Sequence, residues 1–144
     1  ASSMALAGFQ FCLGKAHSSF PLHGMGHELS SMYDMTHGVT LALLTPAWMR
    51  HTLRTAPATL PLFAQFARNV FACTENHAAQ AAEAGIQALT AFYATIRMPA
   101  NLRAAGVREE DLTTMAARAV ERGDLAGLTT IGKTEAVQIF RDAF

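Results

Sequence analysis

The sequence has little charge, little cysteine and no long unbroken apolar run, and each shortage excludes a class of protein. Its 11 basic and 11 acidic residues cancel, whereas a nucleic-acid-binding domain normally carries a basic excess. The low charge and the 51% share of hydrophobic residues argue against intrinsic disorder. Cys12 and Cys73 fit neither a zinc ribbon nor a disulfide framework. We expect both to be buried small side chains in a reducing compartment.

Signals for membrane insertion and secretion are also missing. The longest apolar run, residues 39–49, is interrupted by Thr40, Thr45 and Pro46 and is shorter than the about 20 residues that cross a bilayer. The first residues show no basic stretch ahead of an apolar core, so no signal peptide is visible. We therefore expect a cytoplasmic protein that binds neither nucleic acid nor membranes.

What the sequence does contain is alanine and apolar residues at helical spacing, with no alternating strand pattern. We predict an all-α fold, a helical bundle in one domain. Pro46 is expected to bend or end the helix that contains it. The expected helices cover residues 4–13, 22–32, 38–52, 63–71, 75–97, 109–122 and 133–143.

The helix expected after Thr74 carries the clearest signals. Thr74 is predicted to cap it, Glu75 suits its first turn, and Pro99 follows its end. The predicted buried face comprises Ala79, Ala82, Ile86, Leu89, Tyr93 and Ile96.

Histidine is concentrated near the start of the chain, where four of the six lie between positions 17 and 37. His23 and His27 are one helical turn apart, and a tight corner after that helix would fold His37 back towards them. Imidazole is a frequent metal ligand, but the spacing alone leaves open which of the three bind. An ordinary core or surface role is favoured for the other histidines, His17, His51 and His77.

Several catalytic motifs are absent. Gly24 follows His23, so the HExxH protease motif is not matched. Gly24 and Gly26 lack the third glycine of a dinucleotide fingerprint and more simply allow close packing near the histidines. The sequence has no Walker loop and no specific order of serine or cysteine with histidine and aspartate.

The block HGMGHELSSMYDMTHG, residues 23–38, resembles the metal-site signature of iron-containing (group III) alcohol dehydrogenases. Residues 41–49 resemble the helix that follows this signature in the butanol-dehydrogenase-like branch. Residues 96–112 and 128–140 resemble the C-terminal stretch of the family. The resemblance covers nearly the whole chain and implies part of the family's C-terminal helical metal-binding domain, which is similar to the α domain of dehydroquinate synthase.

The resemblance also implies roles for the three histidines. His23 and His37 match the two metal-binding histidines of the signature. His27 matches a histidine that is not a ligand and lies near the nicotinamide and the substrate, where it is a candidate catalytic residue. The metal, Fe²⁺ or in some members Zn²⁺, holds the alcohol oxygen, and hydride passes between a primary alcohol or aldehyde and NAD(P).

The chain departs from the family in length. Members are more than twice as long and carry an N-terminal dinucleotide-binding domain, and an upstream aspartate and histidine complete their metal site. Nothing in residues 1–144 corresponds to these parts. We therefore predict that this chain alone binds neither metal nor NAD(P) tightly, is inactive, and forms homo-oligomers through apolar faces.

Two other hypotheses about the function of the protein stay open. One is a non-catalytic helical interaction module. The other is a small histidine-rich protein that binds a metal with His23, His27 and His37 together.

Overall fold

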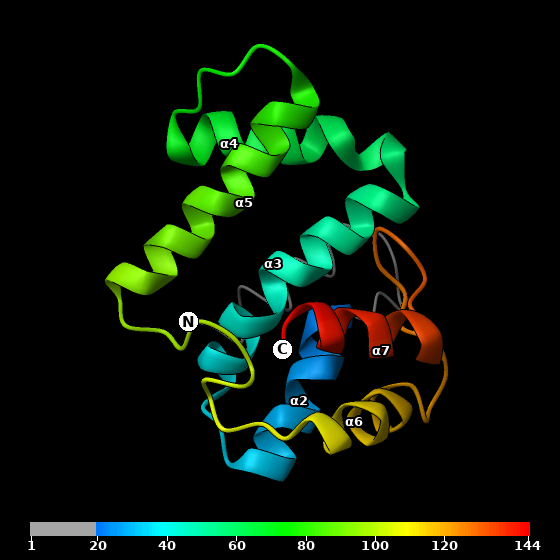
Figure 1. Ribbon diagram of the computed structural model, residues 1–144. Coiled ribbons are helices and arrows are strands. Elements are labelled where there is room, and N and C mark those ends of the chain that lie inside the picture. The colour runs from blue at the N-terminus through cyan, green and yellow to red at the C-terminus, as the bar shows by residue number, and fades with distance from the viewer. Residues whose placement is uncertain (1–19) are drawn as a thin grey trace, which may run out of the picture.

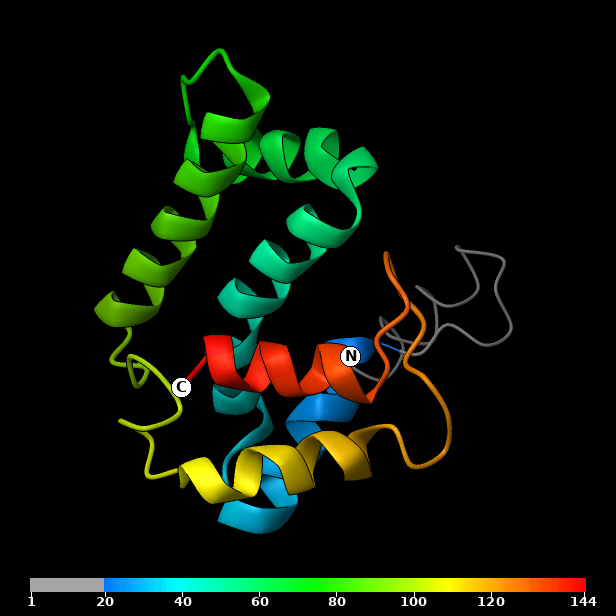
Figure 2. The ribbon, with the colours of Figure 1, turned by 45° about the vertical axis from the view of Figure 1, so that its right-hand side comes forward.

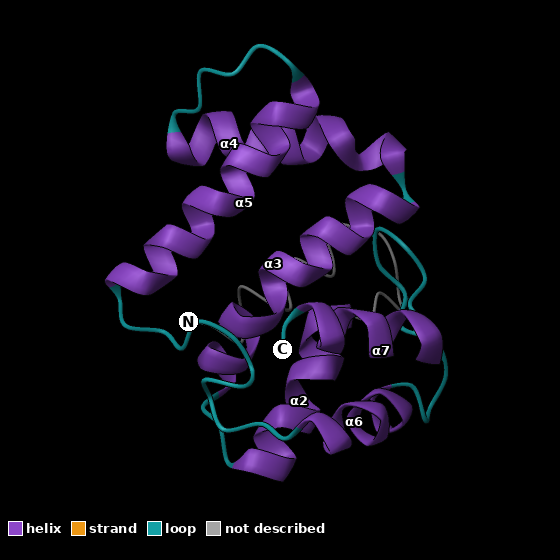
Figure 3. Ribbon diagram, in the orientation of Figure 1, coloured by secondary structure: helices purple, strands orange, loops and turns teal. Residues whose placement is uncertain are grey.

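The computed structural model describes residues 20–144. In this range the chain is helical, as predicted, with an isolated β-bridge between Leu125 and Ile131. Figures 1 and 3 show the arrangement. The predicted helix 4–13, Cys12 and His17 lie outside the described residues. The α-helices are α2 (Pro21–Tyr33), α3 (His37–Thr55), α4 (Leu60–Phe71), α5 (Ala78–Thr95), α6 (Leu112–Ala119) and α7 (Lys133–Asp142), and short 3₁₀ turns cover Pro57–Thr59 and Glu109–Asp111.

The long helix α3 connects two groups of helices (Figures 1 and 2). We call α2, α6, α7 and the half of α3 that packs on them the main bundle, and α4 with α5 the hairpin. The main bundle encloses most of the buried side chains, among them Met25, Leu29, Leu44, Leu102, Met115, Ile139 and Phe140. A second and smaller core between α3 and the hairpin consists of Met49, Phe63, Ala82 and Ile86.

Pro46 lies inside α3 and does not end it. Proline has no amide hydrogen, so one bond of the helical ladder is lost at this point. The neighbouring Thr45 hydroxyl donates to the Leu41 carbonyl at 2.6 Å. The helix continues to Thr55 because its later residues are buried against both cores.

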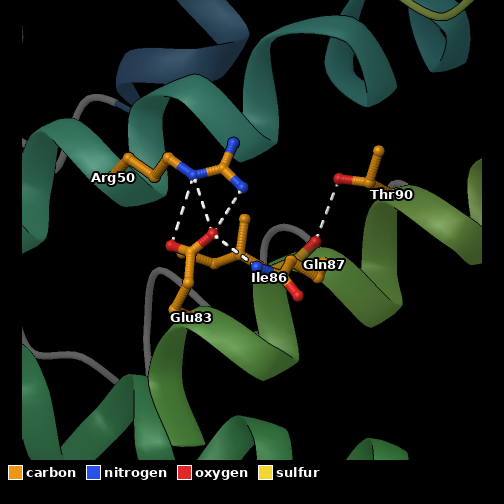
Figure 4. Close-up of polar contacts among 5 residues, drawn as sticks. All are labelled: Arg50, Glu83, Ile86, Gln87 and Thr90. Carbon is orange, nitrogen blue, oxygen red and sulfur yellow. Dashed lines mark hydrogen bonds and ion pairs between the residues drawn. The ribbon is translucent and has the colours of Figure 1, made fainter. Parts of the chain in front are cut away.

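The hairpin is held by very small residues where its helices cross. A β-carbon added at Gly85 would lie 2.6 Å from the Cβ of Ala67 and 3.0 Å from its Cα. Arg50 of α3 forms an ion pair with Glu83 of α5 at 2.8 Å, and Gln87 also donates to this carboxylate at 3.3 Å (Figure 4). The hairpin is therefore attached to α3 by a small apolar core and one partly exposed ion pair.

The predicted start of the helix after Thr74 is wrong, because α5 begins at Ala78 and follows His77. Ala72 adopts a left-handed conformation after α4. The Arg68 guanidinium then donates to the carbonyls of Glu75 and Asn76 at 3.0 and 3.1 Å. These bonds hold residues 72–77 as a loop, so Thr74 does not cap α5.

The predicted burial in this part of the chain is also partly wrong. Ala82 and Ile86 are buried as expected, but Ala79 is exposed and Ile96 is 46% exposed. The last turns of α5 extend beyond α4, the helix on which α5 mainly packs (Figure 2). Cys73, expected to be buried, lies in the loop before α5 and is partly exposed.

No helix among residues 20–144 is both long enough and apolar enough to cross a bilayer.

Candidate metal centre

The corner between α2 and α3 brings two distant parts of the sequence into contact. Pro21 occupies the first turn of α2, where its missing amide hydrogen costs nothing. The helix ends at Tyr33, and Asp34 reverses the chain with a left-handed backbone, φ 51°. After two further residues α3 begins at His37, which places this side chain beside the open face of α2.

The end of α2 is anchored by Tyr33. Its hydroxyl donates to the carboxylate of Asp111, which is only 15% exposed. The same hydroxyl accepts the backbone N–H of Arg108 at 3.1 Å, and the Arg108 side chain donates to Asp111 at 2.9 Å. This network ties the corner to the segment that precedes α6.

The three histidines selected from the sequence meet at this corner. His23 Nδ1 lies 2.9 Å from His37 Nε2, and His27 Nε2 lies 2.8 Å from His23 Nε2. The ring centroids of His23 and His37 are 4.8 Å apart, and those of His23 and His27 are 4.2 Å apart. His23 and His27 are exposed and His37 is partly buried, so the cluster opens to the surface.

The surroundings of His23 favour its neutral form. Burial lowers the pKa of His23, and the adjacent His27 and His37 lower it further because each would repel a positive ring. An imidazole must be neutral to bind a metal ion. The lowered pKa of His23 therefore favours the neutral form that metal binding requires.

The donor set fits a divalent transition metal, but only in part. Two imidazole nitrogens bound at about 2.1 Å lie roughly 3 Å apart at adjacent positions around one ion, close to the 2.9 Å between His23 Nδ1 and His37 Nε2. No carboxylate of residues 20–144 joins them, and Glu28, the residue after His27, pairs with Arg118 at 2.8 Å. Among the described residues, no three histidine, cysteine, aspartate or glutamate side chains are arranged to enclose an ion.

Two residues at this corner were not selected as candidate site residues from the sequence. Thr40 is fully buried, and its Oγ1 lies 2.8 Å from the His37 carbonyl and 3.5 Å from His37 Nδ1. Gly26 allows this contact, because a β-carbon there would lie 2.7 Å from Thr40 Oγ1. The position of Thr40 one turn after His37 is the only sequence signal that points to it.

The other described histidines lie apart from the cluster. His51 is 5% exposed on α3, and its Nε2 has no hydrogen-bond partner among the described residues. Burial is the largest cause that lowers the pKa of His51, followed by the nearby Arg54. His77 is exposed in the loop before α5. Neither contributes to the α2–α3 corner.

Comparison with protein families gives a match along the full length of the chain. The model described as "Fe-containing alcohol dehydrogenase family, C-terminal" matches residues 1–144. NADH-dependent butanol dehydrogenase A of Clostridium acetobutylicum is 34% identical over 100% of this chain and 37% of its own length. The 1,3-propanediol dehydrogenase of Citrobacter freundii is 36% identical over 85% of this chain and 32% of its own length.

Solved structures give the same result for the fold. NADH-dependent butanol dehydrogenase A of Thermotoga maritima superposes with a TM-score of 0.76 and 26% identity, over 87% of this chain and 33% of that protein. A 1,3-propanediol oxidoreductase superposes with a TM-score of 0.71 and 35% identity, over 86% of this chain and 32% of that protein. The chain thus spans about a third of the length of the proteins that it matches.

Proposed function

Because this chain belongs to the Fe-containing alcohol dehydrogenase family, we propose that it forms part of an enzyme that interconverts primary alcohols and aldehydes by hydride transfer with NAD(P). The observation that carries this proposal is the contact between His23 and His37 at 2.9 Å. The relatives named as butanol and 1,3-propanediol dehydrogenases favour a short aliphatic alcohol or aldehyde as the substrate.

His23 and His37 are the proposed metal ligands, with Fe²⁺ as the first choice and Zn²⁺ as the second. A divalent ion bound there supplies Lewis acidity, which favours the alkoxide form of an alcohol and polarises an aldehyde carbonyl. The two histidines hold their nitrogens towards one point because the α2–α3 corner fixes both backbones. The lowered pKa of His23 keeps its ring neutral for this role.

His27 is the proposed catalytic residue. Its ring is exposed beside the proposed ligands, and its Nε2 lies 2.8 Å from His23 Nε2. A histidine in this position could hold or release the proton of the alcohol oxygen. We assign it this role rather than that of a third ligand.

Residues 1–144 are proposed to form part of the C-terminal helical metal-binding domain of this enzyme. We propose that a dinucleotide-binding domain outside these residues binds NAD(P), and that the remaining metal ligands also come from outside. These residues alone are then expected to bind neither metal nor NAD(P) tightly and to be inactive. A cytoplasmic location is proposed, as for an enzyme that depends on soluble NAD(P).

Histidine substitutions in the complete enzyme test these assignments. His23→Ala and His37→Ala are expected to remove bound metal and activity together. His27→Ala is expected to keep the metal and to lower kcat by about 10²–10⁴-fold. His77→Ala is the matched control, since His77 is exposed and lies far from the corner. Metal content by elemental analysis and NADH formation from 1-butanol are the measurements.

Loss of the metal from the His27→Ala variant would contradict the assignment of His27 as a non-ligand. It would favour binding by all three histidines, although no three such side chains of the described residues are arranged to enclose an ion. Failure of the complete wild-type protein to bind both metal and NAD(P)H would instead favour a non-catalytic interaction module, and full metal content and activity in all three histidine variants would contradict the assigned roles.

Self-association is the remaining proposal about partners. The hairpin exposes large apolar side chains, namely Leu62, Val70, Phe92 and Ile96, and such surfaces commonly mark interfaces. We expect light scattering to show homo-oligomers of this chain. The double substitution Phe92→Lys and Ile96→Lys should shift them towards monomer, and a wild-type chain that stays monomeric at high concentration would contradict the proposal.

A further inference from the structure

We propose that Thr40 is a positioning residue of the histidine cluster. It keeps the single proton of the neutral His37 ring on Nδ1 and so leaves the lone pair of Nε2 facing His23. The geometry that supports this inference is independent of any metal. Its consequence for metal affinity rests on the proposed function, in which His23 and His37 are ligands.

The direction of the Thr40 hydrogen bond carries the first step. Thr40 Oγ1 lies 2.8 Å from the His37 carbonyl oxygen, which can only accept, so the hydroxyl hydrogen points to that oxygen. His37 Nδ1 lies 3.5 Å from the same Oγ1. Only lone pairs of Oγ1 remain for the ring. Nδ1 therefore has to carry the hydrogen, since a bare nitrogen there would face an oxygen lone pair.

The packing around Thr40 keeps this arrangement in place. Thr40 is 0% exposed, so its hydroxyl has no direct access to water. Gly26 of α2 lies against the pair: a β-carbon there would approach Thr40 Oγ1 to 2.7 Å and His37 Cε1 to 3.4 Å. The backbone of α2 therefore lies close against both side chains and leaves no room for Thr40 to turn towards α2.

The proton position at His37 determines the other two rings. A neutral imidazole has one N–H donor and one acceptor nitrogen. With its hydrogen on Nδ1, His37 accepts at Nε2, so His23 donates from Nδ1 across 2.9 Å. His23 then accepts at its own Nε2 from His27 Nε2–H across 2.8 Å. All donors point the same way, from His27 through His23 and His37 to Thr40.

The opposite direction is disfavoured at one position. If His37 donated from Nε2 to His23, its bare Nδ1 would face Thr40, whose hydrogen is already bound to the carbonyl. One buried hydroxyl thus selects one of two tautomer sets for three histidines. For the proposed ligand His37, the consequence is an Nε2 without a hydrogen, the effect that an outer-shell hydrogen bond typically has. An ion bound between this nitrogen and His23 Nδ1 would displace the His23 hydrogen from Nδ1 to Nε2.

The direct test is a measurement of the His37 tautomer in the metal-free chain. With ¹⁵N-labelled histidine at about pH 8, where ordinary imidazoles are neutral, long-range ¹H–¹⁵N correlation spectra distinguish the protonated nitrogen from the bare one. We expect Nδ1–H for His37 in the wild type. Thr40→Val keeps the shape but removes the hydroxyl and should shift the population towards Nε2–H. Thr40→Ser should restore Nδ1–H.

Thr90→Val is the matched control, because Thr90 makes a similar hydroxyl-to-carbonyl bond, to Ile86 at 3.0 Å, far from the histidines. It should leave the His37 tautomer unchanged. In a parallel Zn²⁺ titration of the complete enzyme after removal of its metal, Thr40→Val should bind at least about tenfold more weakly than the wild type, and Thr40→Ser should recover most of the affinity.

Two results would overturn the inference: an Nε2–H tautomer of His37 in the wild type, or an unchanged tautomer in a folded Thr40→Val variant. The wild-type spectrum alone decides the first, so a variant that fails to fold does not remove the test. If the tautomers follow the prediction but no variant, wild type included, binds Zn²⁺, the inference stands and the metal-binding role of this pair fails.

Discussion

The main bundle and the hairpin are attached to the same helix, but they are stabilised in different ways. The bundle buries large side chains from several helices, including Met25, Met115 and Phe140, and ties the end of α2 with the Tyr33 network. The hairpin relies on a small apolar core, on small residues at a close helix crossing and on one partly exposed ion pair. All three clustered histidines lie on the bundle side. The proposed site therefore lies in the region that is stabilised both by the larger core and by the Tyr33 hydrogen bonds.

The comparison predicts that the two regions can be destabilised separately. Phe140→Ala in the bundle should lower the free energy of unfolding by about 3–5 kcal/mol and expose the histidine corner to hydrogen exchange. Ile86→Ala in the hairpin should cost about 2–5 kcal/mol, with the loss of protection confined mainly to α4 and α5. Both side chains are 0% exposed. Equal loss of protection everywhere in both variants would show a single cooperative unit.

A smaller change tests the close crossing within the hairpin. Gly85→Ala adds a β-carbon 2.6 Å from Ala67 Cβ and 3.0 Å from Ala67 Cα. Because part of this clash is with backbone, α4 and α5 must move apart, at a cost of about 1–3 kcal/mol despite the better helix propensity of alanine. Urea denaturation monitored by circular dichroism measures the difference.

Gly38→Ala provides the control on the bundle side. Nothing lies within 4 Å of a β-carbon at Gly38, so the substitution should be neutral or stabilising by up to about 1 kcal/mol. If both alanine variants had the same stability as the wild type, the tight crossing would not be a source of hairpin stability.

The smallest expected effect is the loss of stability at acidic pH that comes from Glu83. The hydrogen bond from Arg50 is the largest cause that lowers the pKa of Glu83. A carboxyl with a lowered folded pKa stabilises the fold above its unfolded pKa of about 4.3, and this contribution is lost as the pH falls through the folded value. Since the Glu83 side chain is 42% exposed, we expect less than about 1 kcal/mol, further reduced by salt.

Thermal melts of the wild type and Glu83→Gln between pH 7 and 3 would measure this contribution. The variant should be slightly less stable at pH 7, and the difference should disappear at the acidic end. Glu121→Gln, in the exposed segment after α6, changes the same charge away from the hairpin and should give no such convergence. A Glu83→Gln deficit that grew as the pH fell would contradict the assigned shift.

The sequence predicted the helices and the convergence of His23, His27 and His37 because both depend on local periodicity and on a short corner. The start of α5 was not predictable in the same way. Thr74 is a good capping residue, but Arg68 binds the loop carbonyls and decides where the helix begins. A periodic apolar face also does not say whether another element covers it, which explains the exposed Ile96.

Thr40 and Gly26 illustrate a second limit. Their importance comes from the approach of two helices, and residues on different helices meet at a distance that sequence spacing does not encode. Gly26 was expected to allow close packing near the histidines, and the structure confirms this contact. The packing of Thr40 against Gly26, and the direction of the Thr40 hydrogen bond, are visible only in the structure.

Pro46 has a mechanical consequence for the whole molecule. It interrupts the amide ladder of α3 between His37 at one end and the hairpin at the other, and a helix bends most easily where a backbone bond is missing. Displacement of α4 is therefore expected to be taken up in part as bending of α3 at the proline. The other connection, residues 96–108 after α5, reaches the Tyr33 network without such an interruption, so the two ends of the hairpin are expected to transmit motion to the histidine corner differently.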